Sequence, residues 1–179
     1  MKLLLHACCG PCAIFPLGFL RETGHEVRGY FYNPNIHPYK EYERRLLTFQ
    51  EFSEKVQLEI IIQDDYDLEG FLSMVNGREQ IRCGFCYRMR LREAARIAAE
   101  QGFDAFTTSL LVSPYQKHDL IKQAGEEAGE EFRIPFYYHD FRTGYREGVS
   151  ISREMNLYRQ PYCGCIYSER DRYRKEKKK

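Results

Sequence analysis

The sequence predicts an α/β domain with a mainly parallel sheet and helices on both faces. Short apolar runs alternate with longer segments of helical spacing, and a polar residue or a cysteine stands at or close to the end of each run. No internal repeat or linker interrupts the pattern. With 179 residues and 43% hydrophobic content, the chain can bury one sizeable core, so we expect a single domain.

The first strand is expected over residues 2–7, an apolar run that stops abruptly at Cys8. Gly10 and Pro11 then lead into a helix over residues 13–21, where apolar residues recur at helical spacing. A second strand is expected over residues 26–32 (EVRGYFY), because an Asn-Pro pair follows it.

Residues 39–55 alternate charged and apolar residues at helical spacing and predict the second helix. Residues 58–63 (LEIIIQ) predict a third strand. The acidic stretch 64–82 predicts a short helix, followed by a loop that carries Cys83 and Cys86.

An Ala-, Arg- and Glu-rich segment predicts a helix over residues 87–101, which ends at a glycine. A fourth strand is expected over 103–111 (FDAFTTSLL), a further helix from 113 through 128, and a fifth strand over 132–139 (FRIPFYYH). The last segment, 144–168, is irregular or helical and dense in arginine and tyrosine.

The net charge of +1 conceals a basic end to the chain. Residues 170–179 hold seven Lys and Arg against two acidic residues, so we divide the chain into a domain over 1–168 and a basic tail over 169–179. Such a tail is often only solvated, and less often it contacts nucleic-acid phosphates. No apolar run approaches the roughly 20 residues that cross a bilayer, and the start does not resemble a signal peptide, which predicts a cytoplasmic protein.

Cysteine is the most informative residue type. The seven cysteines form three tight groups, which are Cys8, Cys9 and Cys12, then Cys83 and Cys86, then Cys163 and Cys165. An odd number in clusters does not suggest a disulfide framework. In a reducing compartment, clustered cysteines indicate metal ligands or redox groups.

The Cys8-Cys9-x-x-Cys12 group is the strongest signal. Adjacent thiols cannot close an unstrained disulfide, but they can bind different metals or one shared cluster. The helix that begins near Cys12 offers amide groups that favour anionic sulfur. The alternative is that Cys8 is only a small apolar residue at the end of a buried strand.

The other two groups leave more options open. Cys83 and Cys86 could be a redox pair, half of a zinc site or half of a cluster site, and the surplus of thiols favours iron-sulfur chemistry over structural zinc. Cys163 and Cys165 are spaced too tightly for relaxed ligation of one tetrahedral metal. They could form a strained redox-active disulfide or belong to a core turn.

Other functional signals are weaker. Neither a dinucleotide fingerprint nor a Walker A loop occurs. His6 lies inside the first strand, where a satisfied core histidine is expected. Of the carboxylates at strand ends, we rank Asp67 and Asp140 highest as a metal ligand or proton donor, although residues at such positions usually cap turns.

Arginine and tyrosine alternate through the last third of the chain. Arginine neutralises phosphate and tyrosine stacks on unpaired bases, so the pattern suits a single-stranded RNA loop. The alternative is packing of these side chains on a crowded surface. The candidates for nucleic-acid contact are Arg142, Tyr158, Arg159 and Tyr162.

Five segments in this order resemble the QueH type of epoxyqueuosine reductase over nearly the whole chain. They are residues 5–12 (LHACCGPC), 82–86 (RCGFC), 107–116 (TTSLLVSPYQ), 140–142 (DFR) and 157–165 (LYRQPYCGC). The combination is far more specific than any single segment.

The resemblance implies reduction of the epoxide of epoxyqueuosine, at the wobble position of tRNA, to the alkene of queuosine. It implies a 4Fe-4S cluster, an additional mononuclear iron, an external electron donor and no cobalamin. It also implies a Rossmann-like fold related to the HUP and PP-loop proteins. Where PP-loop enzymes carry a Ser-Gly-Gly phosphate loop, this chain has cysteines, so ATP hydrolysis is not carried over.

On this basis we assign the metal and cofactor ligands to Cys8, Cys9, Cys83 and Cys86, with Cys12 as the next ligand. Asp67 and Asp140 join the Cys8 group as catalytic candidates. Cys163 and Cys165 are either ligands or a redox pair. The rivals are a zinc-stabilised RNA-binding module without redox catalysis, a thiol-disulfide enzyme and a tRNA sulfur-transfer enzyme.

The basic tail provides the first testable prediction. Deleting residues 173–179 should weaken binding of all tRNAs and make the salt dependence of binding shallower, because phosphate contacts are lost. Binding measured over a range of salt concentrations checks this. Unchanged affinity after the deletion would refute the role.

Overall fold

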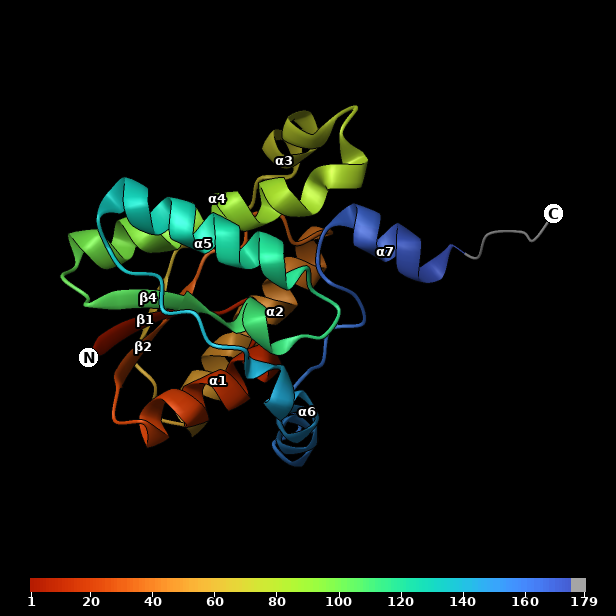
Figure 1. Ribbon diagram of the computed structural model, residues 1–179. Helices are drawn as coiled ribbons and strands as arrows, with labels where there is room; N and C mark the ends of the chain where they lie inside the picture. Colours follow the sequence, from red (N-terminus) through yellow and green to blue (C-terminus); the bar gives the residue numbers. More distant parts are fainter. Residues whose placement is uncertain (175–179) are drawn as a thin grey trace.

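The protein is described by a computed structural model over residues 1–174 (Figure 1). Its centre is a parallel sheet with the strand order β3-β2-β1-β4. The strands are β1 (Lys2–His6), β2 (Glu26–Phe31), β3 (Ile60–Ile62) and β4 (Ala105–Thr108). The expected single α/β domain with a parallel sheet is therefore confirmed.

Helices cover both faces of this sheet (Figure 1). One face carries α4 (Arg82–Glu100) and α5 (His118–Phe132), which pack on each other and, through α4, on β1 and β4. The other carries α1 (Gly10–Glu22), α2 (Tyr39–Lys55) and α6 (Tyr145–Glu154). Two shorter helices, α3 (Leu68–Val75) and α7 (Ile166–Tyr173), lie outside these layers.

The core surrounds the central strand β1. Leu3, Leu4 and Leu5 are fully buried, and apolar clusters form on both sides of the sheet. Helix α2 contributes Phe49 and Phe52 to the cluster on its side. Strands buried on both faces read as continuous apolar runs, which is why β1 is easy to recognise in the sequence.

The chain order places a topological switch between β1 and β4. From β1 the chain moves outward through β2 to β3, and it then crosses back to add β4 on the other side of β1. His6 and Thr108 pair at the carboxyl ends of these two strands. The segments that follow β1 and β4 therefore meet in the crevice where open α/β sheets bind ligands.

The fifth strand predicted over 132–139 is wrong. Phe132 still belongs to α5, and only a single bridge joins Phe106 to Phe136. Phe106 donates to the Pro135 carbonyl and accepts from the Tyr137 amide. Pro135 has no amide hydrogen to extend the ladder, so the pairing ends there.

Other boundaries also differ from the prediction, among them the helix expected from 113 through 128, which is α5 at His118–Phe132. The strand expected over 103–111 ends at Thr108, whose hydroxyl accepts from the Leu110 amide and caps the 3-10 helix η2 (Ser109–Val112). The expected loop carrying Cys83 and Cys86 is instead the first turn of α4. The predicted helix over 39–55 matches α2 at both ends.

The end of the chain differs in one respect from the division that we predicted. Helix α7 runs across the expected boundary between residues 168 and 169, so the first part of the basic tail is helical. Residues 175–179 of that tail lie outside the described residues. Within residues 1–174, no helix combines the length and the apolar character that a bilayer crossing requires.

Gly10 connects the fold to the cysteine segment. A Cβ atom at this position would lie 2.9 Å from the Thr48 carbonyl oxygen and 3.1 Å from the Phe52 Cβ, both on α2. The first turn of α1 therefore packs directly on α2. Any larger residue must push the cysteine segment away from its place.

We predict that Gly10→Ala lowers the free energy of unfolding by about 1–3 kcal/mol, as overpacking does in well-packed cores. Urea unfolding measures the change. Gly18→Ala is the matched control, because it lies on the same helix with open space around its Cβ position. That variant should stabilise the protein by roughly 0.5–1 kcal/mol, and equal effects of both substitutions would contradict the packing argument.

Candidate functional site

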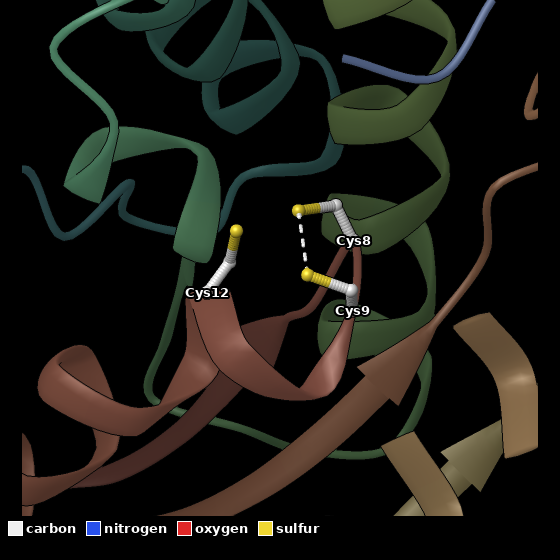
Figure 2. Close-up of side chains that lie close together, drawn as sticks. All are labelled: Cys8, Cys9 and Cys12. Atoms are coloured by element: carbon white, nitrogen blue, oxygen red, sulfur yellow. Dashed lines mark hydrogen bonds between the residues drawn. The ribbon is translucent and has the colours of Figure 1, made fainter. Parts of the chain in front are cut away.

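Three cysteines gather where β1 meets α1. The sulfur atoms of Cys8, Cys9 and Cys12 all lie within 4.8 Å of one another, and those of Cys8 and Cys9 are 3.9 Å apart (Figure 2). Sulfurs bound at about 2.3 Å to one tetrahedral metal lie about 3.8 Å apart. The predicted grouping of these three thiols is present, and its spacing suits shared metal ligation.

The backbone fixes this group in place. Cys9 is the extended N-cap residue of α1, and Pro11 starts the helix without needing a backbone donor. Ser109, which follows β4, accepts from the Cys8 amide at 3.1 Å, and its hydroxyl lies 3.6 Å from the Cys8 sulfur. The segment that follows β1 and the segment that follows β4 are therefore hydrogen-bonded to each other at Cys8.

The three thiols differ in their proton affinity. Hydrogen bonds from Cys12 and Cys9 lower the pKa of the Cys8 thiol well below its usual range, and the nearby charge of Arg90 acts in the same direction. Burial raises the pKa of Cys9, and the hydrogen bond to Cys8 raises that of Cys12. The group is therefore arranged around anionic sulfur at Cys8.

Cys83 and Cys86 approach the same region from α4. They are three residues apart on one helix face, and both pack against the apolar cluster that contains Cys8 and Cys9. Burial raises the pKa of Cys86 to about 12, which the Arg90 charge opposes. In residues 1–174, the close group of ligand atoms contains the first three cysteines and neither of these two.

The Cys163-Gly164-Cys165 turn rests on a buried arginine. Arg45, fully buried on α2, donates to the carbonyl oxygens of Cys163 at 2.8 Å and Tyr162 at 2.9 Å. Its Nε pairs with Glu41 at 2.7 Å. All seven cysteines are free thiols, and Cys163 accepts a hydrogen bond from Gln116 at 3.2 Å.

A second buried arginine, Arg90 on α4, lies beside the same turn. A Cβ at Gly164 would be 3.4 Å from Nη1 of Arg45 and 3.7 Å from Nη2 of Arg90. Arg90 is 2% exposed and donates twice to the neutral amide oxygen of Asn35. Among residues 1–174 it has no carboxylate partner, so anionic sulfur is the counter-charge that the site offers it.

Sequence reasoning missed both buried arginines, although each leaves a signal. Arg90 lies between Tyr87, Leu91 and Ala94 on the buried face of α4, and Arg45 occupies a core position of α2. Charged residues are almost never fully buried unless they are paired. An arginine on the apolar face of an amphipathic helix is therefore the pattern that could have identified them.

A small pocket opens beside Cys12. It is lined by Pro11, Cys12, Val112, Tyr145, Gly148, Val149, Arg159 and Gln160. Gln160 donates to the Cys12 sulfur at 3.0 Å and accepts from the Cys9 thiol at 3.1 Å. The predicted RNA contact Arg159 thus shares a pocket with a predicted metal ligand, and Gln160 is a neighbour of the thiols that the sequence analysis did not identify.

The two ranked carboxylates serve structural contacts. Asp67 caps α3 by accepting from the Gly70 amide at 2.8 Å. Asp140 caps the short helix η3 (Phe141–Gly144) and pairs with Arg142, whose hydrogen bond lowers the pKa of Asp140 to about 2. Asp140 is therefore a carboxylate at neutral pH. The metal-binding or proton-donating roles of both residues stay predictions.

The predicted RNA-binding tyrosines are occupied by contacts within the protein. The Tyr158 hydroxyl donates to Glu41 at 2.6 Å and its ring lies under the Arg44 guanidinium, while the Tyr162 hydroxyl donates to the His37 carbonyl. Contact of either tyrosine with RNA stays a prediction. His6 is the satisfied core histidine expected, because its ring nitrogens hydrogen-bond to the Thr108 hydroxyl and to the carbonyl of Tyr32, the residue after β2.

The donor set fits a thiolate-bound metal group. Three sulfurs lie close together, two further cysteines adjoin the same apolar cluster, and buried guanidinium groups supply positive charge next to them. A site with thiolate ligands carries net negative charge and gains from such neighbours. The arrangement can therefore hold iron or zinc through sulfur.

Arg90→Gln tests this electrostatic role. The substitution removes the positive charge, and we expect the affinity of the thiol site for added iron to fall about tenfold or more, as with other substitutions next to metal ligands. Iron per chain after competition with a chelator measures it. Arg96→Gln is the matched control on the same helix, where Arg96 pairs with Glu93 and Glu100, and it should behave like the wild type. Equal iron retention by both variants would refute the role of Arg90.

Comparison with known proteins gives a consistent result. The family described as "Epoxyqueuosine reductase QueH" matches residues 3–171. A protein of that name from Dehalococcoides mccartyi is 38% identical over 97% of this chain and 96% of its own length. Another, from Thermotoga maritima, is 31% identical over 96% of this chain and 92% of its own length.

A solved structure supports the fold. It is a predicted subunit of a tRNA methyltransferase from Methanocaldococcus jannaschii, with a TM-score of 0.59 and 12% sequence identity. The match covers 86% of this chain and 75% of that protein's chain. At this identity the similarity shows the fold alone, in agreement with the expected Rossmann-like class. The match to the family and the relatives at 31–38% identity show that the chain belongs to the epoxyqueuosine reductase QueH family, whose members are oxidoreductases.

Proposed function

We propose that this protein reduces epoxyqueuosine to queuosine at the wobble position of tRNA, using a 4Fe-4S cluster and an additional mononuclear iron bound by its cysteines. The observation that carries the proposal is the group of Cys8, Cys9 and Cys12 sulfurs within 4.8 Å, in a chain of this family. Cys83 and Cys86 complete the ligand set that we propose. Cys163 and Cys165 serve as further ligands or as a redox pair.

The overall reaction sets what the site must supply. Both carbon–oxygen bonds of the epoxide break, a carbon–carbon double bond forms, and the oxygen leaves as water after taking up two electrons and two protons. An external one-electron donor supplies the electrons. When bound, the metal group provides one-electron transfer and Lewis acidity.

The protein's own residues then have separate tasks. The thiolates would hold the metals, Arg90 would balance their charge, and Arg45, which is paired with Glu41, fixes the Cys163-Gly164-Cys165 turn. The pocket beside Cys12 receives the reacting end of the nucleoside. Asp140, which is held as a carboxylate by Arg142, suits an oxygen ligand for iron better than a proton donor.

The partners follow from the same reaction. The substrate is tRNA carrying epoxyqueuosine, and we propose that Arg142, Arg159, Tyr158, Tyr162 and the basic tail contribute to its binding.

Asp67 is the second candidate, after Asp140, for an oxygen ligand of iron or a proton donor. A cytoplasmic location suits both the tRNA substrate and free thiols.

The experiment that tests the function uses protein purified without oxygen. We expect at least four irons with matching acid-labile sulfide per chain, iron in excess of sulfide, and a visible absorption that a strong reductant bleaches. The loaded protein is then incubated with epoxyqueuosine-containing tRNA and a low-potential reductant. Mass spectrometry of the nucleosides should show that epoxyqueuosine has lost one oxygen atom.

Cys8→Ser should abolish the conversion, because it removes a central sulfur, while Gly18→Ala should convert at the wild-type rate. Colourless protein with one zinc and no sulfide, even after anaerobic reconstitution, would leave a zinc-stabilised RNA-binding module and overturn the proposal. So would unchanged epoxyqueuosine in the presence of a fully loaded protein.

A further inference from the structure

Tyr115 is an exposed aromatic side chain on an anchored loop. It is 84% exposed, between η2 and α5. Its amide donates to the Ser113 hydroxyl, and the buried Tyr87 hydroxyl binds the loop twice, donating to the Gln116 side chain at 2.6 Å and accepting from the Lys117 amide at 3.3 Å. The loop thus holds a large apolar ring in solvent, a placement that folding alone does not favour.

The same loop is joined to the cysteine site. Gln116, the residue after Tyr115, donates to the Cys163 sulfur at 3.2 Å. The ring of Tyr115 stands nearly perpendicular to that of Tyr145, with centroids 6.0 Å apart and an interplanar angle of 83°. Tyr145 in turn lines the pocket beside Cys12. The rings of Tyr115 and Tyr145 therefore form a continuous aromatic surface between the solvent and the pocket that contains Cys12.

The lining of the pocket carries one cation among the described residues, Arg159. The Arg159 charge reaches the Tyr145 hydroxyl, since it counteracts the rise in the pKa of Tyr145 that burial causes. Lys117, two residues after Tyr115, is an exposed cation on the same loop. An aromatic platform with cations beside it suits an anionic strand that carries flat, unpaired bases.

We propose that Tyr115 and Tyr145 form a stacking platform for an RNA loop, with Tyr115 stacking on the base next to the nucleoside that enters the pocket beside Cys12. This inference rests on the proposed function, which requires an unpaired wobble nucleoside at the thiols. Bases turned out of a loop have exposed faces that aromatic rings cover. Because the loop is already anchored, little conformational entropy is lost when RNA binds.

The test is the affinity for a labelled RNA hairpin with an unmodified anticodon loop, measured by fluorescence anisotropy. Tyr115→Ala should weaken binding about tenfold, since base–aromatic stacking is worth about 1–3 kcal/mol and about 1.4 kcal/mol is tenfold. Tyr115→Phe keeps the ring and should bind like the wild type. The slope of log affinity against log salt should stay unchanged in Tyr115→Ala, because no phosphate contact is lost.

Tyr39→Ala is the matched control, because Tyr39 is 53% exposed at the start of α2. It should leave RNA affinity unchanged. A wild type that binds a duplex of the same length as well as the hairpin, or a Tyr115→Ala variant with wild-type affinity, would overturn the platform. Equal losses in Tyr115→Ala and Tyr39→Ala would also overturn it.

Failure of the platform and failure of the proposed function give different results. If the loaded wild type reduces epoxyqueuosine and Tyr115→Ala binds RNA normally, the platform is wrong and the function stands. If Tyr115→Ala loses hairpin affinity but the loaded wild type leaves the epoxide intact, the platform stands and the proposed reaction is wrong. The unmodified hairpin makes the binding measurement independent of the chemistry.

Discussion

The interaction on which the site depends is the contact of two buried guanidinium groups with the Cys163-Gly164-Cys165 turn. Arg45 comes from α2 and Arg90 from α4, so the pair joins helices that cover opposite faces of the sheet. Glu41 balances one of the two charges, and within residues 1–174 Arg90 hydrogen-bonds to the neutral Asn35 alone. A buried positive charge is costly without a counter-charge, and thiolate sulfur provides one. Arg45 therefore holds the third cysteine group in place, and Arg90 beside it favours anionic sulfur.

The sheet topology explains why the cysteines can meet. Parallel strands direct their carboxyl ends to one edge, and the reversal between β1 and β4 opens a crevice there. Ser109, after β4, bonds to Cys8, after β1, and so joins the two sides of the crevice. Related architectures use this position for phosphate at the first helix N-terminus. Here the same amide-rich position carries Cys9 as the N-cap and Cys12 within the first turn of α1.

The thiols and the protein surface are connected through glutamine side chains. Gln160 contacts the sulfurs of Cys9 and Cys12, and Gln116 contacts that of Cys163. These residues lie next to Arg159 and Tyr115 in the chain, which face the solvent. A residue that we propose to bind RNA is thus followed directly by one that contacts sulfur. Such short connections hold a bound substrate close to the site of the chemistry.

The sequence by itself determined the fold class and the cysteine groups as candidate ligands, because apolar periodicity and close residue spacing are local properties of the chain. It also identified α2 at both ends. It misplaced the strand at residues 132–139, because the pairing there is a single bridge between Phe136 and the distant Phe106, and Pro135 has no amide hydrogen to extend it. Only the tertiary structure showed that Arg45 and Arg90 converge on Gly164 and that Tyr145 lies between Tyr115 and the pocket beside Cys12. An arginine on the apolar face of a helix marks a buried position, but its partners come from residues far apart in sequence, so no local pattern could specify them.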